Sequence, residues 1–343
     1  MNCSTRNSRN EPKTSHEQRG EEENLPLLDI QSLVVEYHTL QAVVKAVDRV
    51  SLSVEKGETL GLVGESGCGK STLGLSAIRL VPSPGRIVSG TVTLDGTDVA
   101  NCSEDEIRRV RGKRVGYIFQ DPMTSLNPVK NIGAHFVELI HSHEPKVSRE
   151  DSLKQAQDVL ERLGILPERI SDFPHQFSGG MRQRVMIGLA LALDPDLLIA
   201  DEPTTSLDVI VEAQIIELLK YLKESLKLTL VLITHNIGIV AETADRVAVM
   251  YAGRLAELGE TDALFEKPMQ PYTQALLNSV PNITKKGQVL SSIPGAPPDL
   301  AQPPPGCLFH PRCPYAFDRC KVEEPQLLKH DSSEVACHLY DKR

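Results

Sequence analysis

The chain has 343 residues, which is enough for one large domain with an appendage or for two modest domains. Hydrophobic residues make up 40% and charged residues 24%, as in ordinary globular proteins, and with no Trp and 4% aromatic residues the core must be mostly aliphatic. The formal net charge of -9 argues against nucleic acid as a partner, because non-specific affinity for the phosphate backbone depends on clustered Lys and Arg.

The first 24 residues form a polar tail. Residues 2–24 contain no aliphatic or aromatic side chain, so this segment cannot bury enough apolar surface to order itself, and we predict that it is disordered. It also lacks the apolar middle of a secretory signal, and no later run approaches the ~18 apolar residues that a membrane-spanning helix needs. We therefore expect an intracellular protein, soluble by itself, that reaches a membrane only through a partner.

The segment after the tail is rich in short Val and Leu runs that predict strands. These runs are Leu33–Tyr37, Val43–Val47, Val50–Val54, Leu60–Val63 and Val92–Leu94. Ser71–Leu80 favours a helix, and residues 105–193 are predicted to be mainly helical. Within them, apolar residues recur at helical spacing from Leu153 to Leu163, and Gly164 follows where a helix is expected to stop.

Two later runs, Leu197–Ala200 and Thr229–Ile233, are continuously apolar, which is typical of strands buried on both faces of a parallel sheet. Val209–Leu226 between them predicts the crossover helix, and Arg246–Met250 with Arg254–Leu258 predicts a hairpin. The fold class expected for residues 25–265 is therefore α/β, with a mixed sheet core, an antiparallel β part and a helical insertion.

Residues 266–343 differ in composition. Prolines recur after Pro268 and are expected to break any regular element, and four of the seven cysteines lie between Cys307 and Cys337. We expect a separate, small, Pro- and Cys-rich appendage.

The strongest chemical motif is Gly64-Glu65-Ser66-Gly67-Cys68-Gly69-Lys70-Ser71, followed by Thr72, which fits G-x-x-x-x-G-K-[ST] between a predicted strand and a predicted helix. Its glycines let backbone N–H groups surround the β- and γ-phosphates of a nucleotide, and the helix dipole favours the same negative charge. Lys70 supplies a full positive charge, and the Ser71 hydroxyl is placed to ligate Mg²⁺. The alternative, a chance glycine-rich turn, does not explain the flanking elements.

A second motif is the apolar strand that ends in Asp201 and Glu202. An Asp at such a strand end holds Mg²⁺ in P-loop enzymes, so Asp201 is predicted to bind the metal and Glu202 to act as the general base. A solvated turn is the alternative, since Asp-Glu-Pro is common turn chemistry. The partner motif at Gly64–Ser71 favours the catalytic interpretation.

A third motif is Ser178-Gly179-Gly180, which stands before an apolar helix. Ser178 is a good N-cap, and the two glycines expose backbone N–H groups at a helix start, which suits a second anion. A purely structural cap would account for the Ser and one Gly.

These residues resemble the motifs of ABC-type ATPases. Ser178–Gly180 resembles the signature, Asp201-Glu202-Pro203-Thr204 the Walker B segment, and Ser206-Leu207-Asp208 the D-loop. By the same resemblance Gln120 belongs to the Q-loop and is expected to ligate Mg²⁺ with Ser71 and Asp201, while His235 is the switch histidine. Tyr37 is the expected platform for adenine. Phe177 and Met181 depart from the commoner residues without touching the Ser-Gly-Gly backbone, and Asn236 stands where the family has Asp, which is expected to alter a contact beside His235 without removing it.

Longer segments resemble one subfamily, the ATPase subunits of dipeptide/oligopeptide and nickel importers, with the D-type subunit as the best match. These segments are Gln120–Pro128, Phe173–Met181, Pro271–Leu277, Gly306-Cys307 and His310–Pro314. The resemblance implies a peripheral protein on the cytoplasmic face of the inner membrane, with two permease subunits, an extracytoplasmic solute-binding protein and a second ATPase subunit, more plausibly a paralogue than a copy. It implies ATP and Mg²⁺ as cofactors, and two ATPs between two cassettes, with Ser178–Gly180 of one facing Gly64–Ser71 of the other.

Other interpretations stay open. The solute could be a dipeptide, an oligopeptide, nickel or another small molecule. A non-transport ABC ATPase acting on DNA or ribosomes is disfavoured by the single cassette and the acidic balance. A purely regulatory P-loop module is disfavoured because Glu202 and His235 are both present.

Cys307, Cys313, Cys320 and Cys337 lack the C-x₂-C pairs of zinc ribbons. Four clustered thiols in an intracellular chain favour metal over disulfides, and four thiolates suit Zn²⁺ or a [4Fe–4S] cluster. The family resemblance favours the cluster; zinc, free thiols and disulfides are the alternatives. Cys68 is a separate case, because a thiol at a helix N-terminus is expected to have a lowered pKa, unless it is only a small side chain that fits there.

Overall fold

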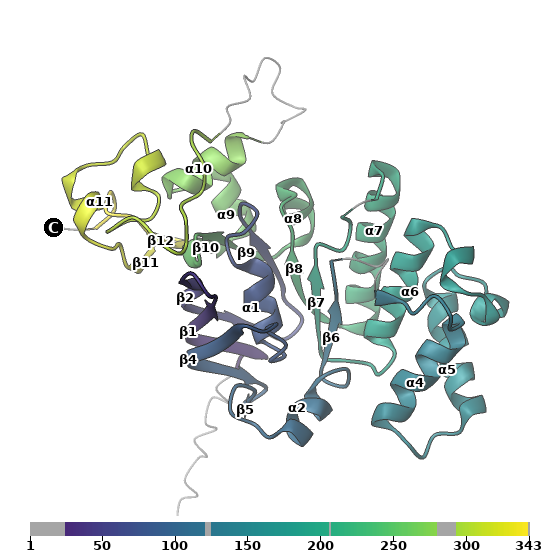
Figure 1. The fold of residues 1–343 in the computed structure, drawn as a ribbon. Helices are drawn as coiled ribbons and strands as arrows, with labels where there is room; N and C mark the ends of the chain where they lie inside the picture. The colour runs from purple at the N-terminus through teal and green to yellow at the C-terminus, as the bar shows by residue number, and fades with distance from the viewer. Residues whose placement is uncertain (1–24, 121–124, 206, 280–292, 342–343) are drawn as a thin grey trace, which may run out of the picture.

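The computed structural model describes residues 25–120, 125–205, 207–279 and 293–341. Its strands form two sheets (Figure 1). The smaller sheet is antiparallel, in the order β2-β1-β4-β5. Its strands are β1 (Leu28–His38), β2 (Val43–Val54), β4 (Gly85–Leu94) and β5 (Thr97–Asp98). The two runs predicted on either side of Asp48 and Arg49 are one continuous strand, β2.

The larger sheet has eight strands in the order β11-β12-β10-β9-β3-β8-β7-β6. From β6 to β9 all neighbours are parallel, and the remaining pairs are antiparallel. Its strands are β3 (Thr59–Val63), β6 (Val115–Ile118), β7 (Leu197–Asp201), β8 (Thr229–Ile233), β9 (Arg246–Tyr251), β10 (Arg254–Glu260), β11 (Leu327–His330) and β12 (Ser333–Ala336). Every residue of β7 and β8 is buried, which confirms the prediction of strands covered on both faces, and β3 is buried throughout as well.

One group of helices stands apart, beside the β6 edge of the large sheet (Figure 1). The separate group is α4 (Ile132–His143), α5 (Arg149–Arg162) and α6 (Gly179–Leu191), which share a core around Phe136, Leu160 and Val185. The others are α1 (Lys70–Ser76), α2 (Glu104–Val110), α7 (Val209–Leu226), α8 (Ile237–Thr243), α9 (Thr261–Glu266), α10 (Pro271–Asn278) and α11 (Asp318–Val322). The predicted bounds of α7 are confirmed, and α5 stops before Gly164, which has a φ of 70°.

Two predicted elements were wrong. Val115–Ile118 is a strand inside the stretch predicted to be helical, and it forms the edge of the parallel sheet beside β7. A run this short, with one Gly, carries no readable period. The proline-rich segment also contains the helix α10. Pro271 occupies its first turn, where the missing N–H of proline costs nothing, and Gln270 caps its N-terminus.

The end of the chain returns to the large sheet. The hairpin β11–β12 pairs through β12 with β10, with Glu257 opposite Val335. The predicted mixed α/β core, antiparallel β part and helical insertion are all present, and the C-terminal extension continues the same sheet. Among the residues that the structure describes, none of the helices has the length and apolar character required to span a bilayer.

Candidate functional site

The glycine-rich loop lies between β3 and α1, at the carboxyl end of the parallel strands. Gly64 and Gly69 have φ values of 152° and 105°. A Cβ at Gly64 would come 2.2 Å from the carbonyl oxygen of Met250, and one at Gly69 would come 2.1 Å from that of Ala46. Only glycine fits at these two positions, so the loop's path is fixed by close backbone approach.

Lys70 begins α1 and is 5% exposed. Its Nζ atom donates to the carbonyl oxygen of Gly64 at 2.8 Å and to that of Glu65 at 3.1 Å. The loop therefore holds its ammonium group with its own carbonyls, beside the N–H groups that are predicted to bind phosphate.

Ser71 and Asp201 come from different elements and are in direct contact. The Ser71 hydroxyl donates to Oδ1 of Asp201 at 3.0 Å, and the Tyr117 hydroxyl donates to Oδ2 at 3.0 Å. Burial raises the pKa of the Asp201 carboxyl, and these two hydrogen bonds oppose that rise. A cation beside Asp201 would favour its charged form, as the predicted Mg²⁺ role requires. Sequence reasoning missed Tyr117, because its strand was not recognised.

Glu202 is in contact with two other residues that were predicted to belong to the site, Gln120 and His235. One carboxylate oxygen, Oε2, accepts from Nε2 of Gln120 at 2.8 Å and from the hydroxyl of Thr205 at 2.9 Å. The other, Oε1, lies 3.4 Å from Nδ1 of His235. Glu202 itself has a φ of 46°, a left-handed conformation that is uncommon outside glycine and is found at functional sites. The fold thus gathers Gln120, Glu202 and His235 beside Asp201, and Thr205 is a contact that the sequence did not reveal.

Three predicted nucleotide contacts have structural partners. The hydroxyls of Tyr37 and Thr72 lie 3.4 Å apart, which places the expected adenine platform next to the start of α1. Asp208 caps α7 by accepting from the N–H groups of Ile210 and Val211. These contacts leave the roles of Tyr37, Thr72 and Asp208 in nucleotide binding as predictions.

Ser178 is exposed at the start of α6, and its hydroxyl accepts from the N–H of Met181, so the predicted N-cap is confirmed. Gly180 also has a packing role, because a Cβ there would come 2.5 Å from Cγ1 of Val211 on α7. Asn236 caps α8 through Gly238, and its amide nitrogen lies 3.5 Å from Oε1 of Glu212.

The expectation of a lowered pKa for Cys68 was wrong. The side chain is buried under the loop, and burial raises the pKa of its thiol, although the nearby Lys70 charge acts in the opposite direction. Desolvation of the thiolate outweighs the attraction of the ammonium group. Cys68 therefore fits the alternative, a small side chain that packs beneath the phosphate-binding loop.

The cysteines of the extension are free thiols in this structure: Cys307, Cys313, Cys320 and Cys337. Burial raises the pKa of Cys337 to about 12; a backbone hydrogen bond at Leu339 opposes this rise, and the charges of the other three thiolates add to it. Within the described ranges, no group of three or more His, Cys, Asp or Glu side chains is arranged to hold a metal ion. The predicted [4Fe–4S] cluster and its zinc alternative are not supported by this arrangement.

Comparison with known proteins gives matches over both parts of the chain. Residues 47–205 match the family model "ABC transporter", and residues 256–320 match "Oligopeptide/dipeptide transporter, C-terminal region". The oligopeptide transport ATP-binding protein OppD of Bacillus subtilis is 47% identical over 88% of this chain and 86% of its own length. The dipeptide transport ATP-binding protein DppD of Escherichia coli is 46% identical over 92% of this chain and 97% of its own length.

Solved structures resemble the cassette part. The ATP-binding cassette MJ0796, solved as a dimer in a post-hydrolysis state with ADP and Pi, is 27% identical with a TM-score of 0.60, over 68% of this chain and 98% of that one. The cbiO1 protein of Clostridium perfringens, part of an ABC transporter complex, has the same identity and TM-score over 71% of this chain and 91% of its own. The predicted ATPase cassette fold is thereby confirmed.

Proposed function

We propose that this chain, which belongs to the ABC transporter family of oligopeptide and dipeptide transport ATP-binding proteins, is the ATP-hydrolysing subunit of an importer of dipeptides or oligopeptides. ATP hydrolysis by this chain is supported by one observation: Glu202 contacts both Gln120 and His235, next to the hydrogen bond between Ser71 and Asp201. The peptide part is supported by relatives whose identity of 46–47% extends through the C-terminal extension.

Each residue of the site has a proposed part in hydrolysis. Lys70 transfers its donated hydrogen bonds from the loop carbonyls to the phosphates of the incoming nucleotide. Ser71, Asp201 and Gln120 hold Mg²⁺, which neutralises charge on the β- and γ-phosphates when bound. Glu202 accepts a proton from the attacking water, and the exposed His235 beside it positions that carboxylate.

The active unit that we propose contains two cassettes. Ser178 is exposed and the two glycines after it are partly exposed, and the Ser178 hydroxyl bonds within its own helix, so the surface of this helix start is open to a second molecule. The related cassette MJ0796 is a dimer in its solved structure. The partner cassette is a paralogue, with its own loop completed by Ser178–Gly180 of this chain.

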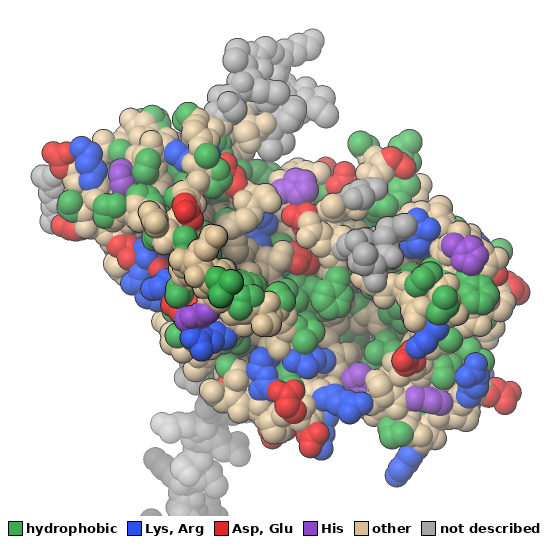
Figure 2. Space-filling view, in the orientation of Figure 1, with side chains coloured by type: hydrophobic (Ala, Val, Ile, Leu, Met, Phe, Trp, Pro, Cys, Tyr) green, Lys and Arg blue, Asp and Glu red, His purple; other side chains and the backbone are tan. Residues whose placement is uncertain are grey.

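A surface groove supports the proposed contact with permease subunits. It encloses about 400 Å³ between the sheet and the separate helices, and apolar side chains gather in this hollow (Figure 2). They include Leu80, Phe119, Leu139, Met186 and Leu189. Phe119 is 41% exposed and directly precedes Gln120, which donates a hydrogen bond to the Glu202 carboxylate. A membrane subunit bound in this groove would therefore contact the residue next to Gln120.

This contact is tested with Phe119→Glu, which places a charge in the groove. We expect loss of co-purification with the permease subunits and unchanged ATP binding by the chain alone. Tyr221→Glu, at an exposed position on α7, is the matched control. Equal retention of permeases by both variants would remove the groove from the proposal.

The four thiols of the extension are the proposed site of a [4Fe–4S] cluster. Burial raises the pKa of Cys307, Cys313 and Cys337, and the charges of neighbouring thiolates add to that rise, so a cationic group would help these thiols to ionise together. One Zn²⁺ would draw four sulfurs to about 3.8 Å from one another, given Zn–S bonds of about 2.3 Å. A four-iron cluster would be held by the same four thiolates. Iron in anaerobically purified protein, lost in Cys313→Ser and kept in Cys102→Ser, is the test.

The solute is tested in the complete assembly of this chain, its paralogue, two permeases and an extracytoplasmic binding protein. The assembly is purified and its ATP hydrolysis is measured with dipeptides, longer peptides and Ni²⁺ in turn. Stimulation by peptides supports the proposal. Stimulation by Ni²⁺ alone would assign the chain to the nickel importers of the same family.

A further inference from the structure

Glu65, the second residue of the phosphate-binding loop, is held by two residues from the C-terminal extension. Its backbone N–H donates to the hydroxyl of Tyr272 on α10 at 2.8 Å. Its carboxylate accepts two hydrogen bonds from Arg312, at 2.7 Å from Nη1 and 2.9 Å from Nη2. Tyr272 and Arg312 lie 207 and 247 residues further along the chain. Both the backbone and the side chain of Glu65 are therefore fixed by distant sequence.

The Arg312–Glu65 pair has the geometry of a built contact. Arg312 is 8% exposed, and its pairing with Glu65 is bidentate. Its Nε atom donates to the carbonyl oxygen of Pro294 at 2.8 Å, and Nη1 also lies 3.3 Å from the hydroxyl of Tyr251. A buried, paired guanidinium with this many partners has one orientation, and it transmits that orientation to Glu65.

An aromatic cluster supports both contacts. The rings of Tyr251, Tyr272 and Phe309 lie 4.5 to 5.4 Å apart, and the Arg312 guanidinium lies 5.9 Å from two of them. Tyr272 is fully buried. The cluster joins the last parallel strand, β9, to the extension, so the groups that hold Glu65 stand on a rigid base.

Glu65 connects this base to Lys70. Its carbonyl oxygen accepts from Lys70 Nζ, while its N–H and carboxylate are bound by the extension. We propose that Arg312 and Tyr272 are positioning residues of the ATP site, so that the C-terminal extension holds the phosphate-binding loop in the conformation that accepts the triphosphate. This inference rests on the proposed function only in taking ATP as the ligand. By linkage, ATP binding in turn tightens the docking of the extension.

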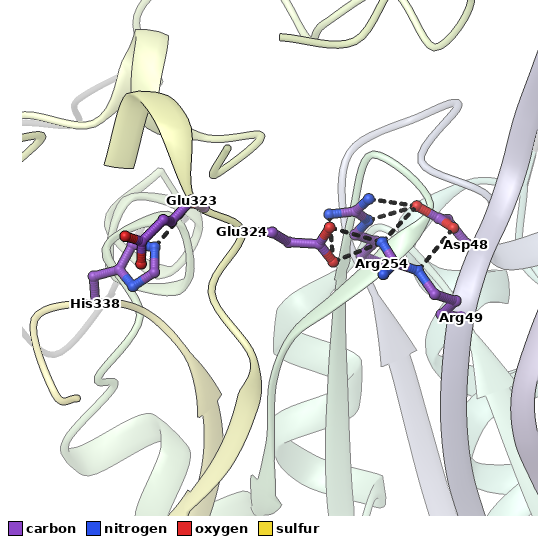
Figure 3. A network of polar contacts seen from close by, with 6 residues as sticks. All are labelled: Asp48, Arg49, Arg254, Glu323, Glu324 and His338. Atoms are coloured by element: carbon purple, nitrogen blue, oxygen red, sulfur yellow. Dashed lines mark hydrogen bonds and ion pairs between the residues drawn. The ribbon is translucent and has the colours of Figure 1, made fainter. Parts of the chain in front are cut away.

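A second ion network between the same two parts supplies a matched control. Glu324 of the extension pairs with Arg49 and Arg254, and both of these arginines also pair with Asp48 (Figure 3). Figure 3 also shows His338, whose Nε2 atom lies within hydrogen-bond distance of the backbone carbonyl oxygen of Glu323. This contact is on the side of the extension away from these arginines. The Glu324 contacts dock the extension to β2 and β10 and include no residue of the phosphate-binding loop.

The test measures the ATP dissociation constant of the full chain. We expect Arg312→Gln to weaken ATP binding about tenfold, because it leaves the Glu65 carboxylate unpaired and the loop loose. The double variant Glu65→Gln, Arg312→Gln should bind better than Arg312→Gln, because no unpaired charge remains. Tyr272→Phe should weaken binding less than Arg312→Gln, and Arg312→Lys should recover part of the loss. Glu324→Gln should stay within about twofold of wild type, because its ion pairs include no residue of the phosphate-binding loop.

A second readout does not depend on nucleotide affinity values. ATP should slow amide hydrogen exchange in residues 307–320 of the wild type, and Arg312→Gln should lose this protection while Glu324→Gln keeps it. Equal ATP affinity in wild type and Arg312→Gln would overturn this inference and leave the proposed function standing. Equal losses in Arg312→Gln and Glu324→Gln would also overturn it, because docking in general would then be the cause. A wild-type chain that binds no ATP would overturn the proposed function together with the inference.

Discussion

Nδ1 of His235 lies 3.4 Å from Oε1 of Glu202, while the second oxygen of the same carboxylate accepts from Gln120. These three residues follow three neighbouring strands of the large sheet, β8, β7 and β6. Because the carboxyl ends of parallel strands meet at one edge, the arrangement follows from the sheet order. It gives the Glu202 carboxylate two contacts, one with Gln120, which follows Phe119 of the groove proposed to bind permease subunits, and one with His235.

Glu202→Gln removes the proposed base while keeping a side chain of the same shape. ATP hydrolysis by the assembled complex should fall by about 100- to 10,000-fold, the usual contribution of a positioned base, and the ATP-bound pair of cassettes should accumulate. The measurements are phosphate release and size-exclusion chromatography with ATP. Glu217→Gln, at an exposed position on α7, is the control. Rapid hydrolysis by Glu202→Gln would remove Glu202 as the base.

Ser178→Arg tests the composite site. The change places a large cation where the second cassette's ATP is expected, so turnover should be lost while ATP binding by the chain alone is kept. The lost N-cap costs about 1 kcal/mol. Ser148→Arg removes the equivalent cap from α5 and should leave turnover intact. If Ser178→Arg weakens ATP binding and ATP turnover equally, two cassettes do not share the site.

Asn236→Asp tests the departure beside the switch histidine. Asp and Asn cap helices equally well, so the variant changes mainly the contact with Glu212, replacing an amide donor 3.5 Å away by a second carboxylate. We expect a loss of about 1 kcal/mol in the free energy of unfolding, measured with urea and reduced at high salt. Asn236→Ala measures the loss of the cap together with the Glu212 contact. A stabilised Asn236→Asp would contradict this account of the position.

Alkylation distinguishes the two interpretations of Cys68. Burial raises the pKa of its thiol, so the reactive thiolate is scarce at pH 8 and increases only as the pH rises further. Mass spectrometry after brief iodoacetamide treatment should show Cys68 modified more slowly than the partly exposed Cys102, with no further slowing by ATP. Preferential modification of Cys68 that ATP prevents would restore the reactive thiol.

The sequence predicted the features that depend on local patterns. Gly64–Ser71 and the β7 strand before Asp201 are short, contiguous signals, and their geometry needs few distant contacts. Val115–Ile118 escaped prediction because a four-residue strand is defined by its neighbour β7, not by its own pattern. Tyr117 was missed with it.

The contacts of Glu65 show the same limit more strongly. Nothing near Arg312 or Tyr272 in the sequence indicates that either reaches the phosphate-binding loop, because α10 and the strand pairing of the extension bring them there. The prediction that prolines break this region also hid α10. Sequence patterns thus pointed to the residues proposed to be catalytic, while the residues proposed to hold the loop became visible only in the fold.

Uptake by the reconstituted importer tests the central claim most directly. Proteoliposomes contain both cassettes and both permeases. ATP is supplied on the side of the membrane that carries the cassettes, and the solute-binding protein and labelled dipeptide are supplied on the opposite side. We predict accumulation of the dipeptide against its gradient, abolished by Glu202→Gln in this chain and kept in Glu217→Gln. ATP hydrolysis that proceeds at the same rate without any peptide movement would contradict the claim that this chain powers peptide import.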